Sequence, residues 1–142
     1  MAALTNLVET LSGIVIDDRP QLEALLRSAP PEWFEITIHQ HMPMFHMEHC
    51  VFCHTLSTGT SHKDCGRPCD HHKVDLKDRV GQAHPLVADV GCRNTLFNAT
   101  AQSAAEYLPR MRELGLRYFR IELLRENPQQ TTDLLTRYAR LL

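Results

Sequence analysis

Near the start of the chain, segments with helical spacing of hydrophobic residues alternate with segments that have the pattern of a β-strand. Four apolar residues recur at positions i, i+3, i+4 and i+7, which predicts a first short helix: Leu4, Leu7, Val8 and Leu11. The apolar run 14–16 predicts a buried strand. Pro20 is expected to open a second helix, which the pair Pro30-Pro31 ends. The aromatic and β-branched run 33–38 predicts another strand.

The region after about Ala99 repeats this alternation. Ser103 and Glu106 have the spacing of a capping box at the start of a helix. That helix is expected to kink or break at Pro109 and to stop at Gly115.

A strand and a final helix complete the chain. The run 118–124 predicts the strand. Asn127, Pro128 and Gln130 then suit the N-cap, N1 and N3 positions of the last helix.

Helix-strand-helix order at both ends favours βα units that contribute to a parallel sheet, and therefore an α/β fold. At 142 residues the chain is expected to form a single domain, residues 1–142. Between these ends, about residues 40–98, the pattern predicts an irregular segment with short strands near 74–79 and 86–90.

Composition excludes several classes of protein. Fifteen Lys and Arg against seventeen Asp and Glu give a net charge of −2, which argues against a histone-like nucleic-acid binder. No apolar run has the length of a membrane span. Residues 1–10 contain no Lys or Arg, so they lack the basic start of a signal peptide, and we expect a cytoplasmic protein.

Cysteine and histidine are concentrated in the irregular segment. All five cysteines lie in the pattern Cys50-x2-Cys53-x11-Cys65-x3-Cys69-x22-Cys92, and eight of nine histidines lie between positions 39 and 72. An odd number of thiols in a reducing compartment disfavours a disulfide framework. Thiolates suit zinc or an iron–sulfur cluster, and composition leaves both open. Buried cysteines that act as small hydrophobic residues are the third alternative.

Several polar residues are further candidates. His39 and His41 follow a predicted strand, where they could bind an anion or carry a proton, or could simply be solvated. Other residues could support the thiols, bind zinc or contact substrate, or form structural ion pairs: His46, His49, His54, His71, His72, Asp78, Arg79, Asp89, Arg93 and Asn94.

Glu35 and Cys50 stand fifteen positions apart in a strand-then-loop context. The pair resembles the signature of the collagenase-like peptidase family, peptidase family U-32, which runs from a strand Glu through a Gly-small-apolar-Cys segment to a Gly-x-Cys-x-aliphatic-Ser end. Five positions depart from that signature, where the family has Gly, a small residue, Cys, Gly and Ser: Gln40, His41, Pro43, Glu48 and Cys53.

The downstream blocks are more similar to the family. The first block is Cys65-Gly-Arg-Pro-Cys69. The second comprises residues 76–79, Gly81 and residues 84–86. The third comprises residues 89–94 and 96–98, and the last is 120–122. The resemblance covers about residues 33–142. The loop 41–45, His-Met-Pro-Met-Phe, is similar to a subgroup related to RNA hydroxylation.

The resemblance implies a fold and a cofactor. The family's fold is an eight-stranded (βα) barrel of the TIM type, which needs roughly 200 residues or more, so this chain would supply only the later βα units with the Cys/His-rich segment inserted. The missing barrel half would then come from another chain or a longer protein. Members related to hydroxylation of RNA or of ubiquinone precursors carry a 4Fe-4S cluster. By position, its ligands here are Cys50, Cys65, Cys69 and Cys92, with Cys53 as a substitute for the cysteine lost at Pro43.

The family's peptidase title makes hydrolysis the alternative activity. The chain has no Gly-x-Ser-x-Gly elbow and no His-Glu-x-x-His helix, and thiols bound to a cluster are unavailable as nucleophiles. A zinc-stabilised module without catalysis is the third hypothesis. The resemblance directs Glu35 inward as a functional carboxylate, so the catalytic candidates are Glu35, His39 and His41, with RNA or a small aromatic molecule as the expected substrate.

Overall fold

The computed structural model describes residues 19–142, so the helix predicted around residues 4–11 and the strand at 14–16 lie outside the described residues. The described chain forms two compact units. The first contains residues 19–40 and Gln102–Leu142, and the second contains His41–Ala101. The second unit therefore coincides with the Cys/His-rich segment expected at about residues 40–98.

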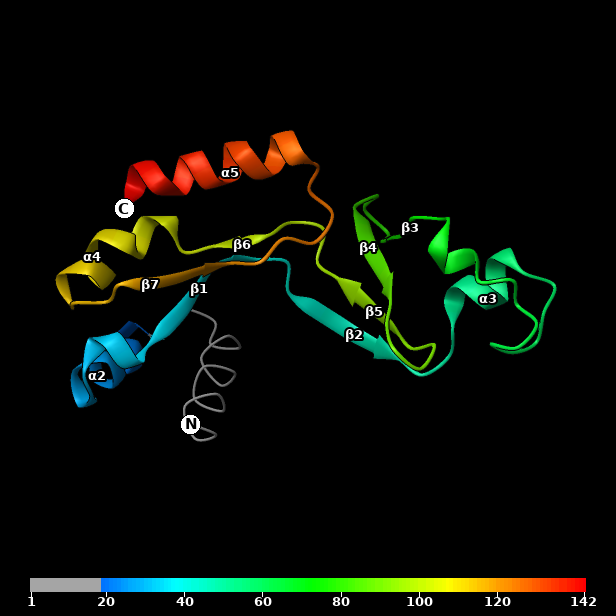
Figure 1. Ribbon diagram of the computed structural model, residues 1–142, viewed down its shortest axis with the longest axis horizontal. Helices are drawn as coiled ribbons and strands as arrows, with labels where there is room; N and C mark the ends of the chain where they lie inside the picture. Colours follow the sequence, from blue (N-terminus) through cyan, green and yellow to red (C-terminus); the bar gives the residue numbers. More distant parts are fainter. Residues whose placement is uncertain (1–18) are drawn as a thin grey trace. The chain divides into compact units, whose positions relative to one another are not determined.

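The first unit is built on a three-stranded sheet with the order β6-β1-β7 (Figure 1). Its strands are β1 (Glu35–Gln40), β6 (Gln102–Ser103) and β7 (Tyr118–Ile121). β1 runs parallel to β7 and antiparallel to β6. The helices of this unit are α2 (Arg19–Ser28), η1 (Pro31–Trp33), η3 (Ala105–Tyr107), α4 (Leu108–Glu113) and α5 (Pro128–Leu141).

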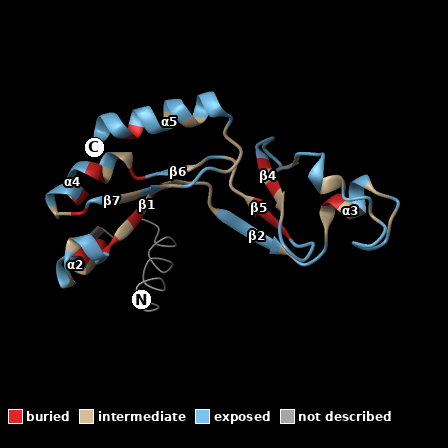
Figure 2. Cartoon of the chain, viewed as in Figure 1, coloured by how far each residue is buried: buried red, intermediate tan, exposed pale blue. Residues whose placement is uncertain are grey.

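One hydrophobic core joins these elements, and its members appear as the buried positions of β1, α4 and α5 in Figure 2. The two inward residues of β1, Ile36 and Ile38, alternate with partly exposed ones, as expected for a strand with one covered face. The buried members are Leu22, Leu26, Phe34, Ile36, Ile38, Ala104, Leu108, Met111, Leu116 and Tyr138.

β1 and β7 form a parallel pair, as expected for the two ends, whereas β6 pairs antiparallel with β1, so the sheet is mixed. The capping box at Asn127 is also confirmed, because its side chain accepts the N–H of Gln130 at 2.9 Å and Gln130 accepts the N–H of Asn127 in return. The predicted strand 118–124 is shorter, since β7 ends at Ile121.

The helix predicted from Ser103 is wrong in its first part. Ser103 ends β6, a single 3-10 turn follows, and α4 begins only at Leu108. Pro109 consequently lies in the first turn of α4 instead of kinking a longer helix. That position tolerates proline because its missing N–H has no helical partner there. Gly115 ends the helix as expected, with a φ of +92°.

The second unit contains a four-stranded antiparallel sheet with the order β2-β5-β4-β3, so this segment is more regular than expected. The short strands expected near 74–79 and 86–90 are present at 74–77 and 83–88. Its strands are β2 (Pro43–Met47), β3 (Val74–Lys77), β4 (Ala83–Ala88) and β5 (Asn94–Phe97). The short helices are α3 (Val51–Leu56) and η2 (Pro68–Asp70). A small core of Phe52, Leu86 and Leu96 packs α3 against the sheet.

The described chain is thus mixed α/β with two small sheets. Neither sheet closes on itself within residues 19–142, and the (βα) barrel remains a prediction. In this part of the chain no helix combines the length and apolar character needed to cross a membrane.

Candidate functional site

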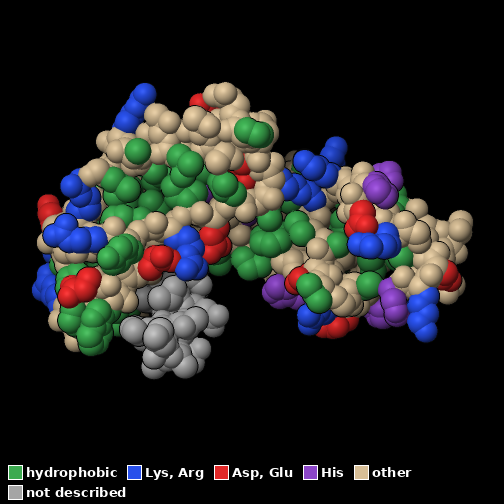
Figure 3. Space-filling model, viewed as in Figure 1, with side chains coloured by type: hydrophobic (Ala, Val, Ile, Leu, Met, Phe, Trp, Pro, Cys, Tyr) green, Lys and Arg blue, Asp and Glu red, His purple; other side chains and the backbone are tan. Residues whose placement is uncertain are grey.

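The second unit has a cavity of about 950 Å³ whose wall contains four of the five cysteines. These are Cys50, Cys53, Cys65 and Cys92. Histidines also border it, and the histidine side chains visible in Figure 3 gather over the part of the chain that forms this unit. All five cysteines are free thiols.

The start of α3 holds the first two thiols. Cys50 is the N-cap residue, and its sulfur accepts the N–H of Cys53 at 3.4 Å. The first N–H of the helix, that of Val51, is donated to Oδ1 of Asn94 at 2.6 Å. Asn94 is fully buried at the start of β5, so the sheet itself fixes where the helix and its thiols begin.

A tight loop brings the third thiol, Cys65, to the same cavity. The carboxylate of Asp64 accepts the backbone N–H groups of Thr60 at 3.0 Å and Ser61 at 2.7 Å. These two hydrogen bonds lower the pKa of Asp64, so it stays ionised and keeps the loop closed. Gly59 lies so close to the backbone of Asp64 and Cys65 that a Cβ at position 59 would overlap it.

Cys92 reaches the cavity from the turn between β4 and β5. Its φ is +62°, in the left-handed region that residues other than glycine seldom adopt. The turn is closed by a hydrogen bond from the N–H of Asp89 to the carbonyl of Arg93 at 2.7 Å. Cys92 is exposed, so neither packing nor a disulfide accounts for a cysteine in this strained position.

Cys69 is the sequence-predicted ligand that does not line the cavity. It packs at the edge of the small core around Phe52. Burial raises the pKa of the Cys69 thiol, and the nearby charges of Asp70 and Cys50 raise it further. The cavity therefore brings together three predicted ligands, Cys50, Cys65 and Cys92, with the predicted substitute Cys53.

The thiols influence one another electrostatically. Burial raises the pKa of the Cys53 thiol, and the neighbouring thiols of Cys65 and Cys50 raise it further. A cation that binds thiolates would relieve this mutual repulsion. Among residues 19–142, however, no three Cys, His, Asp or Glu side chains converge closely enough to hold one metal ion.

Glu35 and His39, two of the catalytic candidates, belong to β1 in the first unit. Glu35 forms an ion pair with Arg120 of β7 at 2.5 Å, although this Oε1 atom lacks the geometry of a hydrogen bond. His39 packs edge-to-face on Tyr138, and its Nδ1 lies 3.2 Å from the tyrosine hydroxyl.

His41, the third candidate, belongs to the second unit. Its Nδ1 lies 2.8 Å from the carbonyl oxygen of Asn98, which orients the ring. His46 is likewise oriented, with Nδ1 3.0 Å from the hydroxyl of Thr95. Both histidines therefore have structural contacts within the second unit's sheet region.

Most of the polar candidates around the β-turns shape those turns. Asp78 accepts the N–H groups of Val80 and Gln82, both at 2.9 Å. Burial opposes ionisation of Asp78, but these hydrogen bonds and a contact with His84 lower its pKa overall. Arg93 donates through Nε to the carbonyl of Val90 at 3.2 Å.

His84 is a polar residue that sequence reasoning missed. It is 9% exposed, its Nδ1 accepts the N–H of Ala99 at 3.1 Å, and its Nε2 lies 3.4 Å from Asp78. Because Nδ1 accepts, the Nε2 atom carries the proton that faces Asp78. A sequence signal for its burial exists: His84 and Leu86 are two positions apart in β4, so both side chains lie on the same, buried face of the strand.

Comparison with protein-family models, with curated proteins and with solved structures gives no match for this chain.

Proposed function

We propose that the thiol-lined cavity of the second unit binds a four-iron, four-sulfide cluster through Cys50, Cys53, Cys65 and Cys92. The observation that carries the proposal is that these four thiols, from three separate segments, line one cavity. Soft thiolate ligands favour iron–sulfur clusters and zinc over hard cations. Three of the four ligands are those that the family resemblance implies, and Cys53 takes the place of Cys69.

A cluster and a single zinc ion make different demands on the thiols. Zinc binds sulfur at about 2.3 Å, so all of its ligands crowd around one point. A four-iron cluster takes one thiolate on each iron, so its ligands surround a larger body. Four cysteines line one cavity of about 950 Å³, and among residues 19–142 no three Cys, His, Asp or Glu side chains converge on one point, so a single zinc ion has the weaker support of the two.

The cluster would supply electron-transfer or Lewis-acid chemistry. Together with the resemblance to peptidase family U-32, this supports a role in hydroxylation of RNA or of a small aromatic ubiquinone precursor. The chain would act as the later part of a TIM-type barrel, completed by a partner chain or by further sequence. A reducing compartment such as the cytoplasm suits these five free thiols.

Peptidase activity receives less support from these residues. A nucleophilic cysteine needs a depressed pKa, whereas the pKa of Cys53 and that of Cys69 are raised. Ligation would also occupy the thiols of the cavity. A zinc-stabilised module is the remaining alternative, and metal analysis distinguishes it from the cluster.

The test is anaerobic purification followed by assays of iron, sulfide and zinc and by an absorption spectrum. We expect a brown protein with iron and sulfide in equal amounts. Protein that is folded, colourless and free of iron after anaerobic reconstitution would overturn the proposal. Zinc in place of iron would establish the zinc-stabilised module.

The variants Cys92→Ser and Cys69→Ser form a matched pair that tests the ligand set. Cys92 lines the cavity and Cys69 does not, so only Cys92→Ser should lose the cluster. Loss of the cluster in Cys69→Ser, with retention in Cys53→Ser, would replace our ligand set with the one that the family resemblance implies.

A further inference from the structure

The first unit has a cavity of its own, about 550 Å³ in volume, between α4, the turn that follows it and the end of α5. Two arginines, Arg112 and Arg117, belong to its wall. We propose that this cavity binds a small phosphate monoester, whose phosphate group these two arginines hold. The proposal is independent of the metal centre in the second unit.

Within residues 19–142, neither arginine side chain contributes a polar contact to the fold. Among the contacts of residues 19–142, neither guanidinium donates a hydrogen bond or forms an ion pair. Arg110, on the same helix, shows the opposite behaviour, because it pairs with Glu23 and Glu113 at 2.9 and 3.0 Å. The positive charges of Arg112 and Arg117 therefore remain available to a ligand.

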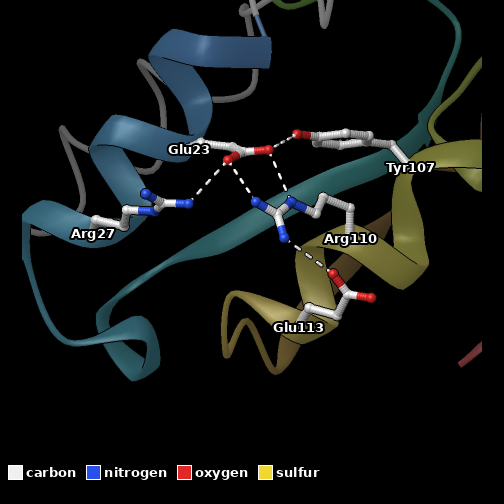
Figure 4. Close-up of polar contacts among 5 residues, drawn as sticks. All are labelled: Glu23, Arg27, Tyr107, Arg110 and Glu113. Carbon is white, nitrogen blue, oxygen red and sulfur yellow. Dashed lines mark hydrogen bonds and ion pairs between the residues drawn. The ribbon is translucent and has the colours of Figure 1, made fainter.

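Glu113 is the carboxylate in the wall of this cavity, and its charge is already matched. Its Oε2 accepts a hydrogen bond from a terminal nitrogen of Arg110 at 3.0 Å (Figure 4). With Glu113 paired in this way, the wall keeps the positive charge of its two arginines.

Helix capping does not explain Arg112 either. Basic residues in the last turn of a helix often bond its free carbonyl groups. In α4 those carbonyls already accept backbone N–H groups: Leu114 donates to Arg110, Gly115 to Arg112, and Leu116 to Met111, at 3.1, 2.9 and 3.1 Å. Among residues 19–142 the Arg112 side chain donates to none of these three carbonyls.

The chemistry of the wall defines the ligand class. Arginine presents a planar fork that matches the oxygens of phosphate, and two such forks suit a dianion. The remaining wall includes the apolar residues Pro109, Leu116 and Leu141, which suit a small organic group. RNA binding needs an extended basic surface, whereas this cavity wall has two arginines and the whole chain has a net charge of −2.

Calorimetric titration of the full chain with phenyl phosphate tests the proposal. We expect saturable binding that inorganic phosphate competes for and acetate does not. Arg112→Gln and Arg117→Gln should each weaken binding about tenfold or more, since each removes charge-assisted hydrogen bonds to the phosphate. Arg137→Gln, on α5 but outside the cavity wall, is the matched control and should bind like the wild type.

Amide resonances of Gly115, Leu116 and Arg117 provide a readout that needs no variant, and they should shift during the titration. Absence of binding by the wild type at millimolar phenyl phosphate would overturn the proposal. So would equal weakening by all three arginine variants. A short RNA that binds more tightly than phenyl phosphate, and is lost with Arg112 and Arg117, would replace the small ligand with nucleic acid.

Discussion

The carboxylate of Glu23 on α2 accepts two hydrogen bonds from the guanidinium of Arg110 on α4, each at 2.9 Å (Figure 4). The hydroxyl of Tyr107 donates a third at 2.8 Å, and Arg27 a fourth at 3.2 Å. Tyr107 and Arg110 lie 84 and 87 positions after Glu23 in the sequence, and both bind its carboxylate. This bidentate geometry links the first helix of the unit to its later βα segment.

Glu23→Gln should destabilise the first unit in a pH-dependent manner. The hydrogen bonds from Arg110 and Tyr107 lower the pKa of Glu23 from 4.5 to about 2. The ionised group therefore contributes stability above its unfolded pKa, and this contribution is lost as the pH falls from 4.5 toward about 2. Thermal unfolding should show a lower midpoint for the variant near neutral pH and converging midpoints in acid.

Glu106→Gln is the control for that experiment, because Glu106 is exposed and has no side-chain contact among the described residues. Its midpoint should follow the wild type at every pH. If Glu23→Gln and Glu106→Gln behaved alike near neutral pH, the carboxylate would not be the link between α2 and α4.

Gly59→Ala should remove Cys65 from the thiol-lined cavity. A Cβ at position 59 would lie 2.4 Å from the carbonyl oxygen of Asp64 and 2.7 Å from the Cα of Cys65, and backbone cannot yield as a flexible side chain does. Iron content after reconstitution should fall sharply. Gly81→Ala is the comparison, since it introduces strain at a φ of +88° with no atom within 4 Å and should keep its iron.

Helix α5 shows why some elements could be predicted. The Asn127 capping box depends on residues within one turn, so the sequence pattern and the structure agree. β2 could not be found in this way, because its residues 43–46 are exposed on both faces and show no alternation. Its position depends on antiparallel pairing with β5, about fifty residues later, which local propensity does not encode.

The candidate site was predictable in composition but not in geometry. The concentration of cysteines between Cys50 and Cys92 predicts a thiol site, which stays a prediction, and four of these cysteines line one cavity. The preference for Cys53 over Cys69 depends on the path of the loop around Gly59 and on the placement of η2. Those features are set by tertiary contacts, so the spacing of cysteines alone could not distinguish the two residues.

Cys92→Gly should separate stability from metal binding. Glycine adopts positive φ without the clash of a Cβ, which outweighs its larger unfolded-state entropy, so the metal-free variant should be at least as stable as Cys92→Ala, whose Cβ keeps the strain at a φ of +62°. The same variant should fail to assemble the cluster. Urea unfolding of the metal-free protein and iron analysis after reconstitution measure the two effects. A variant that is less stable than Cys92→Ala would contradict the backbone argument.

Tyr138→Phe should weaken the first unit more than the loss of an exposed hydroxyl does. The Tyr138 hydroxyl is buried, donates to the carbonyl of Ile38 at 3.0 Å, and lies 2.7 Å from Oγ of Ser103 and 3.2 Å from Nδ1 of His39. Its removal deletes the buried hydrogen bond to the Ile38 carbonyl and the contacts with Ser103 and His39, which costs about 0.5–1.5 kcal/mol.

Two further variants calibrate that loss in urea unfolding. Ser103→Ala should cost less than Tyr138→Phe, because the Tyr138 hydroxyl then keeps Ile38 and His39 as neighbours. Tyr118→Phe removes a hydroxyl from a side chain that is 54% exposed, so its stability should match the wild type. Equal stability of Tyr138→Phe and Tyr118→Phe would mean that the hydroxyl does not hold α5 against β1 and β6, and that packing of the ring alone does so.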